Sequence, residues 1–476
     1  MRSVSLEDVA AGTGGRLEGP ERLAVRGVST DTRTIRAGDL FVALRGERYD
    51  GHQFVEEALS AGAVAALVES RDARNGVPLA RDLPLVTVPD TLRALGDLAS
   101  YVRRGLALRA VGITGSTGKT CTKDLLVSVL SRKYRVAASQ GSYNNEVGAP
   151  LTIFSIKNTD EVLVSEMGAR HAGDITRLTD IVRPELGIIT NVGVTHLQLF
   201  GSVDGVADAK AELARALPPD GALFLNAGDR WTTWISRQTR ARVVRFGSGK
   251  GSRFRATDIE LDAMGRATFT LRGPGFEVQA SLPVPGSHQV ENALAAAACA
   301  SEMGVSPAEI AEGLAGAQVS GWRVELLEAP AGFLVLNDAY NANPHSLSAA
   351  LETLQSLSSS RRAIAVLGAM TELGARSREF HAEAGRESVR RGVDILVTVG
   401  RRARDYASAA CAAGLPRGSA FRVADERAAL ELLAAIVEPG DVILVKASRV
   451  QGLDRLALTL ASPDFHIDDE GAVPDV

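Results

Sequence analysis

A glycine-rich segment near residue 115 has the composition that binds nucleotide phosphates. It reads TGSTGKT (114–120) and lies between a β-branched apolar run and a helical segment. Glycines let backbone N–H groups approach a phosphate, while a following Lys-Thr pair can reach the phosphates and bind Mg²⁺. Position 113 is Ile, where the longer pattern has its first glycine, so the segment is a shorter variant. The complete GKT between a strand and a helix still favours ATP and Mg²⁺ over an ordinary turn. The candidate residues are Gly115, Ser116, Thr117, Gly118, Lys119 and Thr120.

Two further residues could complete a metal site at the same sheet edge, and one lysine nearby is a separate candidate. Glu166 ends a predicted strand, His196 follows the next strand, and Lys210 lies in a predicted helix. Carboxylates and neutral imidazoles bind metals, and ligands gather at the carboxyl ends of parallel strands. Taken singly, each residue has a simpler explanation: a solvated strand end, a structural histidine or a surface lysine. However, only seven of the 53 basic residues are lysines, so a lysine marks a place where arginine would not serve.

Polar residues at other strand and helix ends are weaker candidates. Asn144 and Asn145 lie in a turn before a helix, where turn geometry alone explains asparagine. Asn292 starts a helix, where capping explains it. In the last third of the chain, polar groups follow several apolar strands and together predict a ligand at one sheet edge. These groups are Arg323, Asp338, Asn341, Asn343, Glu372, Lys446 and Arg449.

The elements that would position these residues alternate between strand and helix. A small α/β unit occupies 1–108. Short β-branched runs and crossover helices from 109 to 319 are typical of a parallel sheet, with a hairpin appended at 266–284. A third α/β unit occupies 320–476, and the total length of 476 residues fits two to four domains at roughly 100–200 residues each. We therefore predict an α/β protein of three domains.

Composition argues against several classes of protein. The net charge of −4 provides no basic face, so a dedicated nucleic-acid binder is disfavoured. No apolar run reaches about 18 residues, which predicts no membrane insertion. The N-terminus has no secretory pattern, and the three cysteines have no metal-binding spacing. We expect a cytoplasmic protein, with a monomer as the simplest state.

The motifs together resemble the Mur ligase family, the ATP-dependent amino-acid ligases of peptidoglycan precursor synthesis. The resemblance covers nearly the whole chain in order. It is carried by DTRTIRAGDLFVALRGERYDGHQFVEEALSAGA (31–63), TGSTGKT, SYNNEVGAPLT, EMGARHAGDI, RPELGIITNVGVTHLQLFGS and DAKAEL. DAYNANPHSLSAAL (338–351) and LGAMTELGARSREFH (367–381) resemble the branch that adds D-alanyl-D-alanine, and the DNPR-like signature of a sister branch is missing from the sequence.

The resemblance implies a small N-terminal domain for the UDP-sugar precursor, a central P-loop ATPase domain and a C-terminal Rossmann-like domain. It implies that Lys210 is carbamylated by CO₂ and that Asn292, Arg323 and Asp338 bind the nucleotide. It places catalysis on Lys119, Glu166, His196 and Lys210, and the metal on Thr120, Glu166, His196 and Lys210. It places the uridine nucleotide on Ser29, Thr30, Asp31 and Arg33. The remaining substrate contacts are expected from Asn144, Asn145, Asn341, Asn343, Lys446 and Arg449.

The implied reaction joins D-alanyl-D-alanine to UDP-N-acetylmuramoyl-tripeptide through an acyl phosphate, with ATP and Mg²⁺. Sister ligases that add diaminopimelate or lysine are an alternative, as is a folylpolyglutamate synthase, which normally lacks the N-terminal domain. A slow ATP-hydrolysing switch would not need the polar strand ends of the third unit. A noncatalytic precursor-binding member would not need Lys119, Glu166, His196 and Lys210 together.

Overall fold

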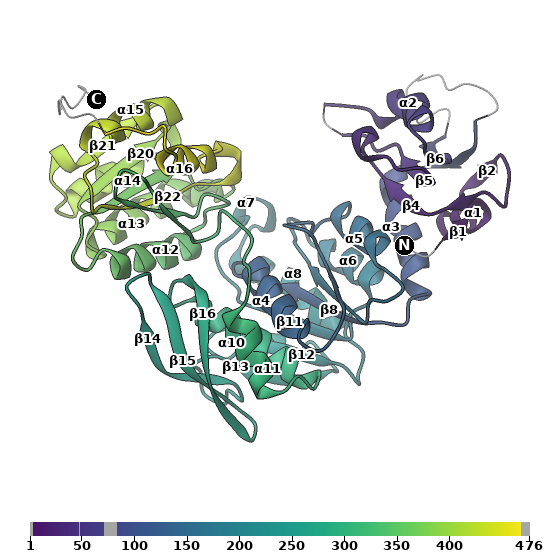
Figure 1. Ribbon diagram of the computed structural model, residues 1–476, viewed down its shortest axis with the longest axis horizontal. Helices are drawn as coiled ribbons and strands as arrows, with labels where there is room; N and C mark the ends of the chain where they lie inside the picture. Colours follow the sequence, from purple (N-terminus) through teal and green to yellow (C-terminus); the bar gives the residue numbers. More distant parts are fainter. Residues whose placement is uncertain (1–2, 47, 71–82, 468–476) are drawn as a thin grey trace.

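The computed structural model describes residues 3–46, 48–70 and 83–467. Figure 1 shows three units in chain order, with the N-terminal and C-terminal units at opposite ends of the central one. Each unit is built on its own sheet, so the predicted α/β class is confirmed. The boundaries at 108 and 319 stay predictions. In the described part of the chain, no helix is both long and apolar enough to cross a bilayer.

The N-terminal unit contains a five-stranded sheet of order β2-β7-β6-β5-β4. Strands β4 to β7 are parallel, and β2 pairs antiparallel at one edge. The sheet strands are β2 (Arg16–Glu18), β4 (Gly27–Ser29), β5 (Asp39–Val42), β6 (Ala65–Glu69) and β7 (Leu85–Val88). A separate pair joins β1 (Val4–Ser5) to β3 (Ala24–Val25), and the helices are α1 (Leu6–Thr13), α2 (Val55–Ser60) and α3 (Thr91–Arg104).

The central unit is a six-stranded parallel sheet of order β13-β12-β11-β8-β10-β9. After β8 the chain adds β9 and β10 on one side of it and then β11, β12 and β13 on the other side. This change of side places a topological switch point at the carboxyl end of β8, where ligands bind in such sheets. The strands are β8 (Arg109–Thr114), β9 (Val136–Ala138), β10 (Val162–Glu166), β11 (Leu186–Ile189), β12 (Ala222–Asn226) and β13 (Arg242–Phe246). Its helices include α4 (Lys119–Leu130), α5 (Gly148–Ser155), α6 (Asp174–Val182), α7 (Leu197–Phe200), α8 (Val203–Ala216) and α9 (Thr232–Ile235).

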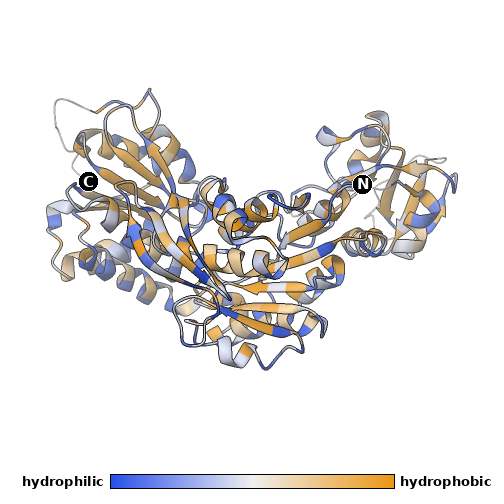
Figure 2. Ribbon diagram, turned by 60° about the horizontal axis from the view of Figure 1, so that its bottom comes forward, coloured by the Kyte–Doolittle hydropathy of each residue, from blue (hydrophilic) through white to orange (hydrophobic). Residues whose placement is uncertain are grey.

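The inner strands read as continuous apolar runs because helices cover both faces of the sheet. Every residue of β10, β11 and β12 is buried, and Figure 2 shows these strands as hydrophobic ribbons. Helix α10 (Gln289–Glu302) is rich in alanine and packs closely on α4, because small side chains let two helices approach. It is followed by α11 (Pro307–Ala315), which a Ser306 capping box starts.

A three-stranded antiparallel sheet extends from the central unit. The predicted hairpin is confirmed as β15 (Arg266–Gly273) and β16 (Phe276–Pro285). The sequence analysis missed the third strand, β14 (Arg255–Leu261), which has an exposed face and weak alternation.

The C-terminal unit is a six-stranded sheet of order β17-β18-β22-β19-β20-β21, in which only the edge strand β17 is antiparallel among the described strands. The strands are β17 (Glu325–Glu328), β18 (Leu334–Asn337), β19 (Ala363–Gly368), β20 (Ile395–Val399), β21 (Ala420–Val423) and β22 (Val442–Lys446). The helices are α12 (Pro344–Leu357), α13 (Ser377–Arg390), α14 (Arg404–Ala412), α15 (Glu426–Ile436) and α16 (Asp454–Leu460). Strand β22 lies between β18 and β19, so its last residue, Lys446, stands at the switch point of this sheet.

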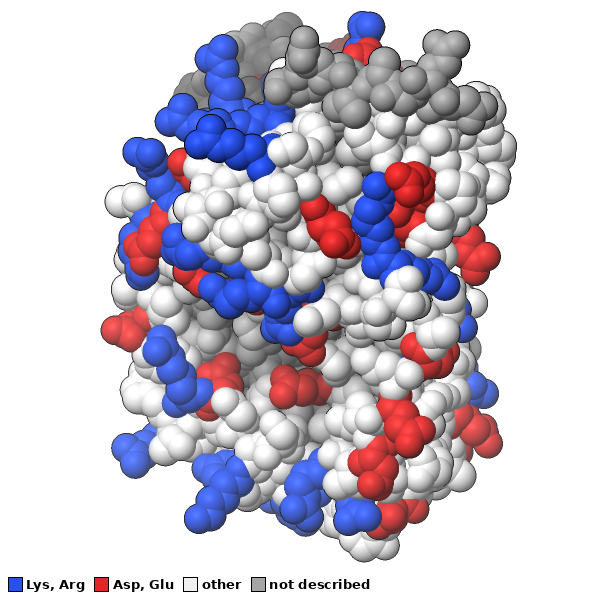
Figure 3. Space-filling view, turned by 90° about the vertical axis from the view of Figure 1, so that its left-hand side faces the viewer, with Lys and Arg blue, Asp and Glu red and all other residues white. Residues whose placement is uncertain are grey.

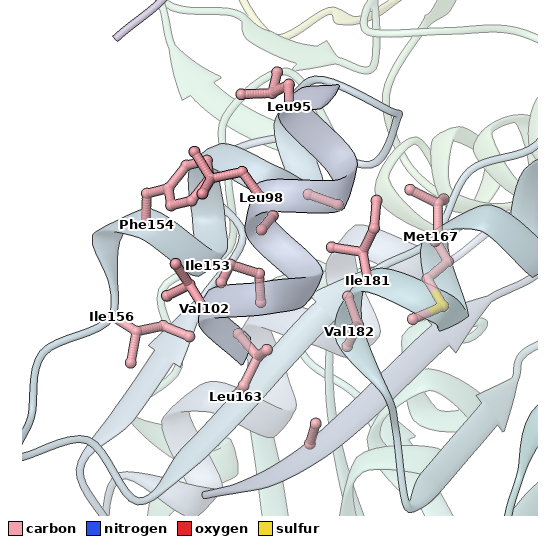
Figure 4. Packing of buried hydrophobic residues seen from close by; sticks show 14 of the residues in the cluster. Leu95, Leu98, Val102, Ile153, Phe154, Ile156, Leu163, Met167, Ile181 and Val182 are labelled. Carbon is pink, nitrogen blue, oxygen red and sulfur yellow. The ribbon is translucent and has the colours of Figure 1, made fainter. Parts of the chain in front are cut away.

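Helix α3 joins the N-terminal unit to the central one. Figure 4 shows Leu98 and Val102 of α3 beside Phe154, with Ile181 of α6 on another side of the helix. All belong to one hydrophobic cluster that also contains residues of β5, β6 and β8. The two units therefore share a continuous apolar core.

Candidate active site

The glycine-rich segment forms a tight turn between β8 and α4. Gly115 has φ of 150°, and a Cβ there would lie 1.9 Å from Oγ1 of Thr190. Gly118 has φ of 78°, and a Cβ would lie 2.4 Å from Oδ1 of Asn292. Both positions therefore require glycine, for backbone conformation and for space. The turn ends at the N-terminus of α4, whose free N–H groups suit a phosphate.

A second loop, after β11, holds this turn in place. Asn191 Oδ1 accepts hydrogen bonds from the backbone N–H and the hydroxyl of Thr117, at 3.0 and 3.1 Å. Ser116 Oγ accepts from the N–H of Gly193 at 2.9 Å. The sequence analysis did not assign Asn191 a role, although it follows a predicted strand of the same sheet. The phosphate-binding turn is thus preorganised by its neighbour.

Lys119 lies at the start of α4 with its ammonium group folded over the turn. Its Nζ donates to the carbonyl of Gly115 at 2.8 Å. Burial lowers the pKa of Lys119, and the positive charge of Arg323 lowers it further. Glu166 acts in the opposite direction, and a bound anion would likewise favour the charged form of Lys119, as expected of a lysine that binds phosphate.

Glu166 and Thr120 form the pair of oxygen donors predicted for the metal. Thr120 Oγ1 donates to Glu166 Oε2 at 2.6 Å, and Asn144 Nδ2 donates to Glu166 Oε1 at 2.8 Å. Glu166 is buried at the end of β10, only 1% exposed. A hydroxyl, a carboxylate and an amide at adjoining strand ends form a donor set that Mg²⁺ accepts. Of the predicted substrate contacts, Asn144 is therefore placed beside the predicted metal site.

Lys210 is buried in α8, with 1% of its surface exposed. Among the described residues, no hydrogen bond or ion pair engages its ammonium group. Burial, together with repulsion from Lys119, lowers its pKa to about 7. Burial therefore favours the neutral amine form of this lysine. The prediction of an ordinary surface lysine is excluded by its burial.

His196 lies between the central and C-terminal units. It occupies the left-handed region at the start of α7, with φ of 48°, and its Nδ1 makes a short hydrogen bond with Oε2 of Glu372. Burial lowers the pKa of His196. Arg170 donates from Nη2 to the other Glu372 oxygen at 2.6 Å. Although burial acts in the opposite direction, His196 and Arg170 hold the pKa of Glu372 below its ordinary value.

Arg170 is a site residue that the sequence analysis missed, and Glu372 was only one of its weak strand-end candidates. Glu372 has φ of 61°, a strained conformation for a glutamate, and it comes from a strand end in a different domain. The available signal was its place directly after an apolar strand. The sequence gives no signal that Glu372 pairs with His196, which lies 176 positions earlier in the chain.

The predicted nucleotide contacts of the C-terminal unit face the central one. The Arg323 guanidinium lies 3.7 Å from the ring centroid of Tyr340 and donates to Ser142 Oγ at 2.9 Å. Asn292 lies beside the phosphate-binding turn, where its Oδ1 accepts from Thr122 at 3.3 Å. Asp338 accepts from the backbone N–H of Val324 at 3.2 Å, next to Arg323. These three predicted residues therefore border the same region as Lys119.

Several predicted substrate residues already have partners within their own unit. Lys446 forms a short ion pair with Asp338 and donates to the carbonyl of Asn341 at 3.0 Å. Arg449 lies over the ring of Trp322, 4.4 Å from its centroid. Asn343 caps α12, with its Oδ1 accepting from Ser346 N at 2.9 Å. Asn145 similarly accepts from Gly148 N at the start of α5.

The four residues predicted for the uridine nucleotide lie together in the N-terminal unit, at the end of β4 and in the turn that follows it. Ser29 Oγ accepts from Asp31 N at 3.2 Å, and Asp31 forms an ion pair with Arg33 at 2.6 Å. The hydrogen bond from Arg33 holds the pKa of Asp31 at about 2. Thr30 lies between these residues in the same turn. The group belongs to a different sheet from the phosphate-binding turn.

Comparison with known proteins gives matches over nearly the whole chain. The model of the Mur ligase family catalytic domain matches residues 24–103, the Mur ligase middle domain 113–300, and the Mur ligase glutamate ligase domain 322–449. A relative from Mycobacterium tuberculosis, a UDP-N-acetylmuramoyl-tripeptide--D-alanyl-D-alanine ligase, is 40% identical and covers 92% of each chain.

Two solved structures extend the match to three dimensions. The crystal structure of MurF from Acinetobacter baumannii has a TM-score of 0.87 and 32% identity, covering 97% of this chain and 99% of the other. MurF ligase from Thermotoga maritima, solved in complex with ADP, has a TM-score of 0.79 and 28% identity, covering 92% and 97%.

Proposed function

This chain belongs to the Mur ligase family, and we propose that it joins D-alanyl-D-alanine to UDP-N-acetylmuramoyl-tripeptide, converting ATP to ADP and phosphate. The observation that carries the proposal is the convergence of Lys119, the Thr120–Glu166 pair and the buried Lys210 around one sheet edge, faced by Arg323 from the next unit. Such an arrangement can bind a nucleoside triphosphate and a metal, with an acceptor that approaches from the C-terminal unit.

The chemistry follows from the weakness of a carboxylate as an electrophile. The tripeptide carboxylate attacks the γ-phosphorus of ATP, and ADP leaves, giving an acyl phosphate. The amine of D-alanyl-D-alanine then attacks the acyl carbon, loses a proton, and expels inorganic phosphate as the amide bond forms. Lys119 and the N–H groups of 115–120 stabilise the charge that develops on the transferred phosphoryl group.

Mg²⁺ would be held by Thr120 and Glu166, with His196 near it, and would neutralise phosphate charge during transfer. Asn144 and Asn191 position these groups rather than touch phosphate: Asn144 fixes Glu166, and Asn191 fixes the turn at Thr117. Arg323 reaches the nucleotide from the C-terminal unit. Closure of that unit would exclude water, which otherwise hydrolyses the acyl phosphate.

Lys210 is proposed to react with CO₂. A neutral amine attacks the carbon of CO₂ and loses a proton, leaving a carbamate that carries one negative charge. Burial favours this reaction because it lowers the pKa of Lys210 to about 7. The resulting carboxylate-like group would supply the oxygen donor for metal that a lysine lacks.

The first experiment measures phosphate release with ATP, Mg²⁺, UDP-N-acetylmuramoyl-tripeptide and D-alanyl-D-alanine, leaving out one component at a time. We expect release to require all four and to yield the pentapeptide. Varying residue three of the tripeptide between diaminopimelate and lysine defines the acceptor. Turnover with a single free amino acid and a dipeptide precursor would instead favour the sister ligase. Turnover with a folate substrate would favour the folylpolyglutamate synthase. ATP hydrolysis without any of these substrates would favour the ATP-hydrolysing switch.

The carbamate has its own test. Lys210→Ala should lose most of kcat, with ADP binding retained, and high bicarbonate should not restore it. Lys210→Arg is the matched control because it keeps the charge and cannot form the carbamate under these conditions. A ¹³C signal from ¹³C-bicarbonate should be present in wild type and missing in both variants. Near-normal activity of Lys210→Ala would contradict the assignment.

A further inference from the structure

Lys123 is a buried lysine that the proposed mechanism does not use. Figure 3, which views the molecule from the side of the C-terminal unit, shows charged side chains spread over that surface, where water solvates them. Lys123 lies instead inside the central unit, on α4, with 3% of its surface exposed. A lysine is almost never buried to this degree unless its ammonium group is paired. The partners of Lys123 therefore indicate what it does.

The ammonium group of Lys123 has three acceptors, which match its three N–H donors. Its Nζ donates to the backbone carbonyls of Ser139 and Gly141, at 2.9 and 3.0 Å. It also forms an ion pair with Asp124, whose Oδ1 lies 3.1 Å away. The neighbouring residue on α4 thus compensates the charge, and the two hydrogen bonds to carbonyls go to a single loop.

The loop that Lys123 contacts, residues 139–145, follows β9 and borders the predicted metal site. Asn144 of this loop donates from Nδ2 to Oε1 of Glu166 at 2.8 Å. Ser139 contacts the same strand end, because its Oγ accepts from the N–H of Glu166 at 3.3 Å. The position of the Glu166 carboxylate therefore depends on how this loop is held.

The loop and the ion pair also reach the segment that leads into the C-terminal unit. Ser142 of the loop accepts from Nη2 of Arg323 at 2.9 Å. The second carboxylate oxygen of Asp124 accepts from the N–H of Ser320 at 2.8 Å, three residues before Arg323 in the chain. The surroundings of Lys123 are thus linked both to the metal site and to the segment that delivers Arg323.

We propose that Lys123 is a positioning residue for the metal site: it fixes its loop so that Asn144 orients the Glu166 carboxylate for Mg²⁺. The proposal rests on the proposed function, which places Mg²⁺ at Glu166. A residue that orients a metal ligand without touching the metal commonly contributes about 10–100-fold to metal affinity. Lysine serves in this arginine-rich chain because a compact ammonium group meets three separate acceptors, whereas a planar guanidinium favours a bidentate partner.

The experiment measures the binding of AMP-PNP, a nonhydrolysable ATP analogue, by isothermal titration calorimetry with and without Mg²⁺. We expect Mg²⁺ to strengthen the binding to wild type. In Lys123→Met this strengthening should fall by about tenfold, the loss expected when a metal ligand is no longer oriented. Binding in the absence of Mg²⁺ should be unchanged, which a general disturbance of the nucleotide site would not allow.

A double-mutant cycle separates positioning from a merely structural role. Asn144→Ala should reduce the effect of Mg²⁺ by a similar factor. Lys123→Met should then add little to that loss, because both substitutions act through the same carboxylate. If the two losses instead multiply as independent factors, Lys123 does not act through Asn144 and the proposal is overturned.

Lys133→Met is the matched control. Lys133 also donates to a backbone carbonyl, that of Gly304, but it is exposed and lies beyond the C-terminal end of α4. Its substitution should leave the effect of Mg²⁺ unchanged. Thermal unfolding verifies that each variant is folded, and Lys123→Gln, which keeps N–H donors, is the second variant if Lys123→Met does not fold.

The proposal is overturned if Mg²⁺ changes the binding of AMP-PNP equally in wild type and in a folded Lys123 variant. The binding assay needs neither the tripeptide precursor nor D-alanyl-D-alanine, so its outcome does not depend on the ligase reaction. Wild-type turnover of ATP that requires neither of these substrates would instead overturn the proposed function.

Discussion

The central domain meets its two neighbours through different kinds of contact. On the N-terminal side, Leu98 and Val102 of α3 pack against Phe154 in one apolar core, as Figure 4 shows. At Gly96 of the same helix, a Cβ would lie 3.3 Å from Ile181, so the helices approach closely. We call this set of contacts the apolar junction.

On the C-terminal side the contacts are mainly polar, although Val194 and Met264 of the central unit also pack against the C-terminal core. Glu372 bridges Arg170 and His196, and Arg323 reaches Ser142. We call these contacts the polar junction. Separating the apolar junction would expose its apolar surface to water, at a free-energy cost of about 25 cal/mol per Å². Polar groups exchange their partners for water at little net cost. The difference teaches that the N-terminal domain is fixed to the central one, while the C-terminal domain is attached by contacts that can be replaced during a catalytic cycle.

The largest expected effect is a contrast in hydrogen exchange. The N–H groups of Gln198 and Ser320 donate across or beside the polar junction, to Glu372 and Asp124. We expect them to exchange at least about 1,000-fold faster than the amides of Leu95 and Leu98, because a local opening exposes them while α3 opens only with the core. Exchange measured by NMR checks this, with buried α10 amides as reference. Equal protection of the amides in both junctions would contradict the proposed difference between them.

Truncating the apolar junction should destabilise the whole protein. Leu98→Ala removes a fully buried side chain and should lower the free energy of unfolding by about 2–5 kcal/mol. Leu458→Ala is the control, because Leu458 is 46% exposed on α16. Denaturant unfolding measures both. A loss below about 1 kcal/mol for Leu98→Ala would mean that α3 repacks without the contact.

Lys210 belongs to neither junction, and it serves as an internal reference for the effect of a buried charge on the free energy of unfolding. Its folded pKa of about 7 lies below the ordinary 10.5, so the unfolded chain binds more protons between these values. In CO₂-free buffer, the penalty of charging Lys210 is fully present below about pH 7 and disappears as the pH rises toward 10.5. Lys210→Met should therefore be more stable than wild type at pH 6, and this advantage should shrink above pH 7, on the order of 1.4 kcal/mol per pH unit. Unfolding curves at several pH values measure it, and an advantage that grows with pH would contradict the assignment.

The smallest effect is expected at the polar junction. Arg170→Gln removes an ion pair with Glu372 whose arginine side chain is 65% exposed. Such a pair contributes about 0–1 kcal/mol, so the free energy of unfolding should change by no more than this. A loss above about 2 kcal/mol, measured beside Leu98→Ala, would show that the two junctions are of one kind.

How much of the site could be predicted depends on how local its signals are. The turn at 114–120 and the helix after it follow from residues adjacent in sequence, and the structure places β8 at the predicted 109–114. Glu166 was predicted from its strand end, and Thr120 Oγ1 lies 2.6 Å from it because β8 and β10 are parallel neighbours. Periodicity and strand ends were enough for these groups.

Pairings between distant parts of the chain were not predictable. Glu372 meets His196 only because the third sheet is placed beside the second one, a result of packing that no local pattern records. Asn343 caps α12, and its expected contact with a ligand stays a prediction, because polar clusters at helix starts do not distinguish the two roles. The sequence analysis did not single out Arg401, Arg402 and Arg404, which the fold places around a cavity.

The sequence by itself determined the class of this protein: alternating strands and helices, a phosphate-binding turn that requires Gly115 and Gly118, and a scarce lysine at 210. These features depend on local backbone preference and side-chain chemistry, which adjacent residues specify. Only the tertiary structure decided that Lys210 is buried, that α3 shares a core with the central domain, and that the C-terminal domain is attached mainly through polar contacts. Burial and charge compensation depend on the neighbours that folding brings together, and it is these that set the pKa of Lys210.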